Sequence, residues 1–108
     1  MRDRICPRFQ AAADLLGRRW AGLVVQALQQ GPAKFSALSA QLEVVGDRML
    51  SVRLRDLEAN GVVERKVLEN RGVEYRLTRK GRALGRVIAS LGRWAEQWVD
   101  LPHRGVHP

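Results

Sequence analysis

The stretch GDRMLSVRLRDLEANGVVERK, residues 46–66, decides the fold of this chain. It predicts a helix with one apolar face, because Leu50, Leu54 and Leu57 recur at the i, i+4, i+7 spacing of a core-facing helix. Long cations and small residues fall on the opposite face, namely Arg48, Ser51, Val52 and Arg55. A helix that enters the major groove of DNA needs such a surface. A helix whose charged face is merely solvated would show the same pattern, so the neighbouring segments must decide between the two.

The residues before this helix predict three shorter helices. The first covers Phe9–Leu16, and Gly17 is placed to end it. The second runs from about Arg18 to Gln29, where Gly31-Pro32 stops it. An extended piece at Lys34-Phe35 leads into the third, with Ser36 expected as its N-cap and Leu38 and Leu42 facing inward.

The residues after it predict a β-hairpin and a long last helix. Asn60-Gly61 should end the quoted helix, with Gly46 or Asp47 capping its start. The strands are VVERKVLE (62–69) and VEYRL (73–77), joined by a turn at 70–72. Thr78 should cap the last helix, which carries a wide apolar stripe.

This order of elements predicts a winged helix-turn-helix, mainly α with a small β-hairpin as the wing. The 108 residues suffice for one domain with one modest core. We expect that core between residues 5 and 99, and a frayed tail at 101–108.

Composition favours an anionic partner. The formal net charge is +8, from 19 basic and 11 acidic residues, and 16 of the 19 are arginine. Arginine suits phosphates and base edges, so nucleic acid is the leading candidate. The sequence has no run of about 18 apolar residues, so no transmembrane helix is expected. The start MRDRICPRFQ lacks the apolar core of a signal peptide. A single cysteine excludes an intrachain disulfide. We therefore expect a cytoplasmic protein that is nucleoid-associated when bound to DNA, with no membrane partner.

Four segments together resemble the HxlR-type family of winged-helix regulators, relatives of the MarR type. They are CPRFQAAADLLGRRW, GPAKFSALSAQL, DRMLSVRLRDLEANGVVERKV and VEYRLTRKGRAL, within residues 5–98. The resemblance implies a homodimeric transcription factor that dimerises through its first and last helices and places the fourth helix in the major groove. Two features depart from the family pattern: Gly46 stands where a capping Ser is frequent, and the wing has the short, charged ENRG.

Enzymatic chemistry finds little support in the sequence. The two histidines, His103 and His107, lie in the tail, and no carboxylate pair, phosphate-cradling loop or set of metal ligands is present. We expect no enzyme activity, no cofactor and no metal.

Further basic and polar residues could extend a DNA contact beyond the fourth helix. In the wing these are Arg71 and Arg76, whereas Arg65 could equally pack its stem or pair with an acid. Lys34 and Ser36 flank the start of the third helix, and Lys80 lies in the first turn of the last. A solvated hairpin and simple helix capping remain the alternatives.

Apolar residues of the first and last helices predict the dimer interface. The expected set is Phe9, Leu16, Leu91, Trp94 and Trp98. Trp20, Trp94 and Trp98 could instead line a pocket for a small effector, although aromatics at helical spacing more often form a core or an interface.

Cys6 is a second candidate functional residue. Arg2, Arg4 and Arg8 would favour its thiolate and raise its reactivity, whereas a small buried apolar role is the competing interpretation. The chain is thus expected to be a homodimeric, sequence-specific regulator on a pseudopalindromic operator of double-stranded DNA. Two alternatives are a regulator switched by an oxidant or small molecule, through Cys6 or an aromatic pocket, and a winged-helix module that binds another protein.

Overall fold

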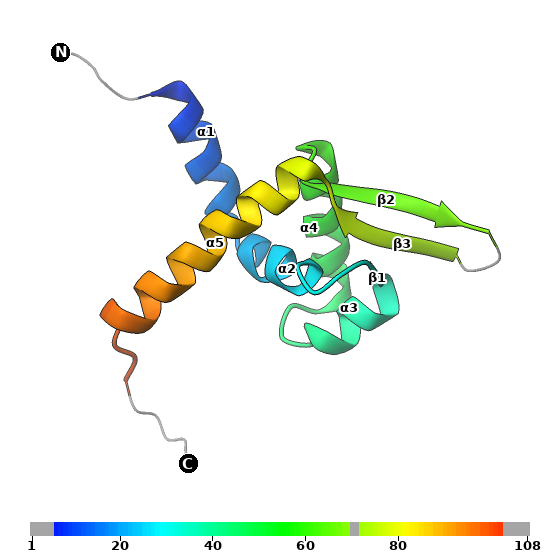
Figure 1. Cartoon of the computed structure of the whole chain (residues 1–108). Helices are drawn as coiled ribbons and strands as arrows, with labels where there is room; N and C mark the ends of the chain where they lie inside the picture. Colours follow the sequence, from blue (N-terminus) through cyan, green and yellow to red (C-terminus); the bar gives the residue numbers. More distant parts are fainter. Residues whose placement is uncertain (1–5, 70–71, 103–108) are drawn as a thin grey trace.

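A computed structural model describes residues 6–69 and 72–102, which form a helical body with a projecting hairpin (Figure 1). Arg71 of the predicted wing contacts, together with Arg2, Arg4, His103 and His107, lies outside the described residues. The elements are α1 (Pro7–Leu16), α2 (Ala21–Leu28), β1 (Ala33–Lys34), α3 (Phe35–Gln41), α4 (Asp47–Ala59), β2 (Val63–Leu68), β3 (Gly72–Leu77) and α5 (Arg79–Trp98). The predicted order of elements and the winged helix-turn-helix fold are confirmed.

Helix α4 supplies the centre of the core. Leu50, Leu54 and Leu57 are fully buried, as the spacing predicts, and they pack with residues of α2, α3 and β2. Leu38 of α3 and Leu42 just after it also face inward, as expected. The apolar stripe of α4 therefore fixes which side of the helix remains for a partner.

The end of α4 is set by Asn60 and Gly61. Gly61 has a left-handed φ of 74°, which a residue without a Cβ adopts freely. The amide of Val62 then donates to the carbonyl of Leu57, and the amide of Gly61 donates to that of Glu58. This Schellman motif confirms the predicted stop and turns the chain directly into β2.

The sheet has three strands in the order β1-β3-β2, so the wing is not the isolated two-stranded hairpin that the sequence suggested. The short extended piece pairs with β3, where Ala33 faces Tyr75 and Lys34 faces Glu74. Strand β2 pairs antiparallel with β3 from Val63–Leu77 to Leu68–Gly72. The pairing satisfies backbone groups at the base of β3 and joins the wing to the start of α3.

Three helix starts differ from the prediction. Helix α1 begins at Pro7 rather than Phe9, since proline is tolerated in a first turn, where its missing N–H has no partner to lose. Helix α2 begins at Ala21 rather than Arg18, because turn hydrogen bonds occupy residues 17–20 and Trp20 adopts a left-handed φ of 73°. Helix α3 begins at Phe35 with Lys34 at the N-cap position, so Ser36 lies inside the helix and does not cap it.

Helix α5 crosses the body and continues past it, on the side away from the hairpin (Figure 1). The hydroxyl of Thr78 accepts a hydrogen bond from the amide of Gly81, which confirms Thr78 as the cap. A Cβ built on Gly81 would lie 2.0 Å from the carbonyl oxygen of Val62. The absence of a side chain at Gly81 therefore allows α5 to lie directly against the start of β2.

Candidate nucleic-acid interface

The outward face of α4 is the core of the candidate site. Arg48 and Arg55 are exposed, and Ser51 and Val52 between them are half-buried. All four lie away from the buried leucine stripe. The arrangement presents two guanidinium groups, a hydroxyl and a methyl-bearing side chain on one helix, which are the groups that read base edges in a major groove.

A hollow of about 450 Å³ separates this face from the sheet. Ser51, Arg55 and Glu58 line it from α4, and Arg65 and Tyr75 line it from β2 and β3. Arg65 and Tyr75 are cross-strand partners, so their side chains share one face of the sheet. The structure therefore adds Arg65 to the set around Arg55. The sequence contained the signal, because Val63 and Val67 flank Arg65 at the two-residue period of a strand.

Arg53 is the arginine of α4 whose side chain makes contacts within the domain. Its side chain is only 11% exposed and forms an ion pair with Asp56. The same carboxylate forms a second ion pair with the guanidinium group of Arg18, at an N–O distance of 3.4 Å. Its Nε donates to the carbonyl oxygen of Arg19 at 2.7 Å. These contacts hold α4 against the turn before α2 and leave Arg53 unavailable for DNA.

The two helices of the helix-turn-helix are joined by a side-chain hydrogen bond. The hydroxyl of Ser39 in α3 donates to the carboxylate of Asp47, the first residue of α4. Asp47 also has the sign that favours the N-terminal end of a helix dipole. The bond restrains the direction in which α4 leaves the turn.

Two of the predicted DNA contacts, Arg76 and Lys34, lie on the face of the sheet opposite to the α4 hollow. Arg76 neighbours Tyr75 along β3, so its side chain points to the opposite side, where Glu74 lies 3.5 Å away. Lys34 is exposed and paired in register with Glu74, which puts it on the same outer face. The structure therefore does not bring Arg76 and Lys34 together with Arg55.

Lys80 and Ser36 are also separated from the α4 set. The ammonium group of Lys80 donates to the carbonyl oxygen of Asn60 at 2.6 Å, at the end of α4 farthest from Arg48. Ser36 is exposed in the first turn of α3. Lys80 thus already has a structural partner, whereas Ser36 has an open surface.

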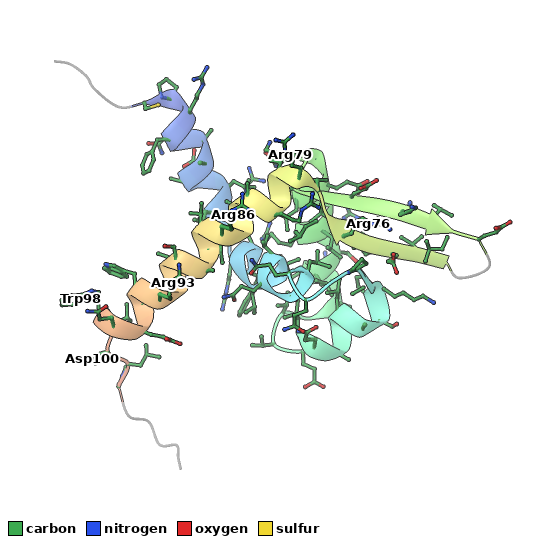
Figure 2. All side chains as sticks on the ribbon, viewed as in Figure 1. Arg76, Arg79, Arg86, Arg93, Trp98 and Asp100 are labelled. Atoms are coloured by element: carbon green, nitrogen blue, oxygen red, sulfur yellow. The ribbon has the colours of Figure 1, made fainter. Side chains whose placement is uncertain are left out.

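Large apolar side chains of α1 and α5 face solvent. Phe9, Trp94 and Trp98 are 69%, 56% and 66% exposed, and Leu91 lies on the same stripe of α5. Figure 2 shows Trp98 at the far end of α5, beyond the body of the domain. Leu16 differs, because it is half-buried against the core of its own chain.

A groove of about 610 Å³ runs between α1 and α5. Apolar residues form most of its lining, among them Ala11, Ala12, Leu15, Ala83, Leu84 and Val87. It adjoins the exposed apolar stripe of α5 through Val87. The three tryptophans do not gather into one pocket, because Trp20 packs on the core beneath the Arg19 guanidinium while Trp94 and Trp98 are exposed.

Cys6 is exposed at the N-cap of α1, so it is not a buried packing residue in this chain. Within residues 6–69 and 72–102, no group of three or more His, Cys, Asp or Glu residues is placed to hold a metal ion. Nor does that part of the chain contain a helix whose length and apolar character would let it cross a membrane.

Comparison with known proteins shows what this arrangement resembles. Residues 15–103 match the model of the HxlR-like helix-turn-helix family. The chain is 42% identical over 100 residues to YvaP of Bacillus subtilis, an uncharacterized HTH-type transcriptional regulator, covering 91% of this chain and 93% of YvaP. It is 38% identical to the HTH-type transcriptional regulator YodB of the same organism, over 93% of this chain and 91% of YodB.

Solved structures show the same likeness. The reduced form of YodB superposes with a TM-score of 0.81 at 39% identity, over 90% of this chain and 97% of the YodB chain. YodB has also been solved in quinone-bound and diamide-treated forms. The oxidized form of the redox regulator HypR gives a TM-score of 0.78 at 32% identity, over 89% of this chain and all of the HypR chain.

Proposed function

The chain belongs to the HxlR-like helix-turn-helix family and is a transcriptional regulator of that type, and we propose that it acts as a homodimer on a pseudopalindromic DNA operator. A regulator of this kind is not an enzyme. It would work in the cytoplasm, on the nucleoid when bound to DNA.

The observation that carries the DNA contact is the outward face of α4. Arg48 and Arg55 would bind guanines or phosphates, Ser51 a base edge or phosphate, and Val52 a thymine methyl. Arg65 extends this surface across the hollow beside Arg55. Ser36 near the start of α3 and Arg71 of the predicted wing turn would add phosphate contacts. Lys34 and Arg76 lie on the outer face of the sheet and Lys80 is bound to Asn60, so these three residues are not part of the proposed DNA surface.

The dimer is supported by the apolar surface of α1 and α5. Phe9, Leu91, Trp94 and Trp98 are all at least 50% exposed, and a group of large exposed apolar side chains is typical of an interaction surface. A second copy would cover it, with Leu16 at the edge of the contact. Two α4 helices related by a two-fold axis would then meet successive major grooves, about 34 Å apart.

Capture of genomic fragments by the pure protein, followed by a salt titration, tests the DNA-binding function. Each neutralised phosphate should lower log K by about 0.9 per log unit of salt. We expect a steep loss of affinity, and Arg55→Ala should flatten the slope relative to the matched variant Arg93→Ala. An affinity that does not change with salt would contradict this proposal and favour the protein-binding alternative, with the aromatic part of α5 as its docking surface.

A second function, redox sensing through Cys6, is favoured by one observation. The thiol is exposed at the start of α1, beside the proposed dimer surface. Two similar proteins were solved in different states, YodB in reduced and quinone-bound forms and the redox regulator HypR in an oxidized form. Because the chain has one cysteine, two-electron oxidation would join it to the partner's Cys6 or to a small thiol, and the two thiol protons and two electrons would pass to the oxidant.

Operator affinity before and after diamide treatment tests this second function. Wild type should lose or gain affinity, and Cys6→Ser should keep one affinity in both conditions. Mass spectrometry of the intact protein identifies a disulfide-linked dimer or a thiol adduct. Equal operator affinity of treated and untreated wild type would rule out redox control by Cys6 without affecting the DNA-binding proposal.

A further inference from the structure

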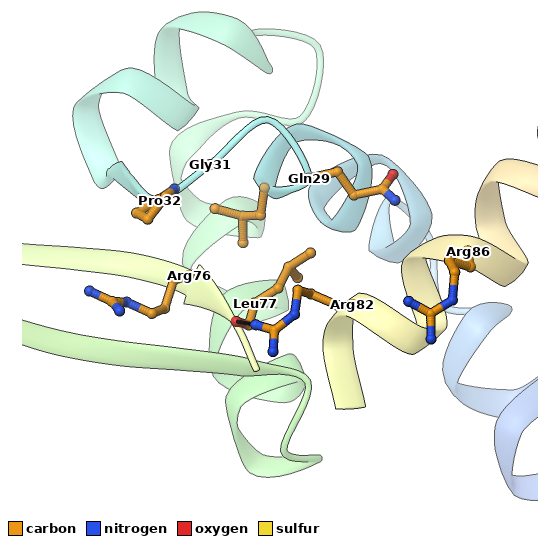
Figure 3. A pocket seen from close by; sticks show the side chains of 8 residues that line it. Gln29, Gly31, Pro32, Arg76, Leu77, Arg82 and Arg86 are labelled. Carbon is orange, nitrogen blue, oxygen red and sulfur yellow. Dashed lines mark hydrogen bonds between the residues drawn. The ribbon is translucent and has the colours of Figure 1, made fainter. Parts of the chain in front are cut away.

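A basic cavity of about 410 Å³ lies on the outer face of the sheet, away from the α4 surface. It is open to solvent on one side and is bordered by the end of α2 and the segment leading to β1, by the end of β3 and by the first turns of α5. Arg76, Arg82 and Arg86 contribute guanidinium groups, and Leu28, Pro32 and Leu77 contribute apolar surface. Figure 3 shows Arg76 on β3 and Arg82 and Arg86 on α5 in a row below the segment that carries Gln29, Gly31 and Pro32.

The positive charge at the α5 side of this cavity has little compensation from the described residues. Arg76 has two acidic neighbours on its face of the sheet, Glu74 at 3.5 Å and its cross-strand partner Glu64 on β2. Arg82 donates to the carbonyl oxygen of Leu77 at 3.4 Å, and in the described part of the chain Arg86 has no carboxylate within 4 Å. Arg82 and Arg86 are moreover separated by one helical turn, where like charges repel.

One hydrogen-bond donor of Arg76 has no acceptor. Its Nε is buried and makes no hydrogen bond, although the side chain as a whole is 35% exposed. The inner edge of the guanidinium group is thus desolvated while its outer nitrogens reach solvent. Because the Nε has almost no accessible surface, a ligand in the cavity would be bound by the outer nitrogens of Arg76.

The walls of the cavity are preformed. The side chain of Gln29 lies over Gly85, where an added Cβ would come within 2.5 Å of the amide nitrogen of Gln29. The glycine therefore makes room for Gln29 beside the arginines. Leu28 and Leu77 belong to the buried core, so the apolar floor is fixed by the packing of the domain.

DNA bound to the outward face of α4 would not reach this cavity. Successive side chains of β3 alternate between the two faces of the sheet, so Tyr75 faces Arg55 and Arg76 faces away. The cavity and the α4 hollow share no lining residue. A ligand in this cavity would be smaller than a nucleic acid and would carry its own negative charge.

We propose that this cavity binds a small carboxylate ligand with an apolar body. A carboxylate accepts two parallel hydrogen bonds from one guanidinium group, and that of Arg86 has no acidic partner in the described part of the chain. The apolar part would lie on Pro32 and on the aliphatic stems of the arginines, over the nearly buried Leu28 and Leu77. The proposal goes beyond DNA binding and does not depend on it.

Calorimetric titration with benzoate, in the absence of DNA, tests the proposal on the full chain. We expect saturable binding with a Kd of about 1 mM, in keeping with so small a ligand. Arg86→Gln should weaken it at least tenfold. This variant removes no contact that the fold uses, and Arg93→Gln is its matched control because it removes the same charge from α5 outside the cavity.

Neutral benzamide and inorganic phosphate complete the experiment. Benzamide should bind much more weakly than benzoate, because it lacks the charge, and phosphate should bind more weakly because it lacks the apolar part. The proposal is overturned if wild type shows no saturable benzoate binding, or if Arg86→Gln and Arg93→Gln bind benzoate equally. It is also overturned if Arg86→Gln lowers DNA affinity as much as Arg55→Ala does, because DNA phosphate would then be the anion.

Discussion

The ammonium group of Lys80, in the first turn of α5, donates a hydrogen bond to the carbonyl oxygen of Asn60 at the end of α4. A cation in the first turn of a helix opposes that helix's dipole, but here it lies at the negative end of another helix. The Lys80 side chain also passes beside Gly61, where an added Cβ would lie 3.7 Å from it. Lys80 therefore joins the two helices that carry the proposed DNA contact and the proposed dimer surface.

Lys80→Met tests this structural role, because methionine keeps an apolar stem and removes the charge. The free energy of unfolding should fall by about 0.5–1.5 kcal/mol, with DNA affinity nearly unchanged. Thermal unfolding would show a lower Tm, by roughly 4–8 °C per kcal/mol. Arg79→Met is the matched control and should change Tm less. If Lys80→Met instead weakened DNA binding at constant Tm, Lys80 would be the phosphate contact that the sequence suggested.

Local signals predicted the elements of this fold well. The spacing of Leu50, Leu54 and Leu57 and the capping roles of Thr78 and Gly61 act within a few residues, so sequence alone reveals them. The pairing of Ala33 with Tyr75 joins distant segments and has no local pattern. The contact of Lys80 with Asn60, twenty residues apart, was missed for the same reason.

The candidate site was predicted only in part. The helical period placed Arg48 and Arg55 on the outward face of α4, whereas basic character alone suggested Arg76. The period of a strand separates the two faces of the wing, and applying it to Val63, Arg65 and Val67 would have favoured Arg65. Burial of Arg53 depends on contacts with Asp56 and the Arg19 carbonyl, which only the folded chain brings together.

Alanine substitutions in α4 should separate binding from stability. Arg48→Ala and Arg55→Ala should each weaken operator binding by about 1–3 kcal/mol, or roughly 5- to 150-fold, with little change in Tm. Leu54→Ala should destabilise the domain by about 2–5 kcal/mol, because it leaves a cavity in the core. Binding assays and thermal unfolding on the three variants check this. An unfolded Arg55→Ala beside a stable Leu54→Ala would mean that the helix faces the other way.

Neighbouring residues of β2 should differ in DNA binding although both are exposed and basic. Arg65 shares the α4 side of the sheet with Tyr75, and Lys66 points to the outer face. Arg65→Ala should therefore weaken operator binding at least fivefold and reduce its salt dependence, and Lys66→Ala should do neither. Both affinities are measured at several salt concentrations. Equal effects of the two substitutions would show that the wing contributes charge without a preferred face.

Two glycines of α5 should respond in opposite directions to alanine. Gly81→Ala places a Cβ against the carbonyl of Val62 and should destabilise the domain by about 3 kcal/mol or more, the upper range of overpacking. Gly92 has no neighbour within 4 Å, so Gly92→Ala should stabilise the helix by about 0.5–1 kcal/mol. Chemical denaturation of both variants measures the difference. A tolerated Gly81→Ala would show that α5 can move away from β2 at little cost.

The exposed aromatic end of α5 should be the part of the chain that controls assembly. Trp94 and Trp98 contribute little to the core of their own domain, so replacing both by serine should leave the fold intact. The same replacement should remove the largest apolar side chains from the proposed dimer contact, where aromatic residues dominate the binding energy. Sedimentation at micromolar concentration should show wild type as one dimeric species and the double variant as a monomer with unchanged circular dichroism. The monomer should also bind a two-half-site operator far more weakly, because linked half-sites no longer raise the effective concentration. A wild type that sediments as a monomer would remove the dimer from this proposal and leave α4 to read a single half-site.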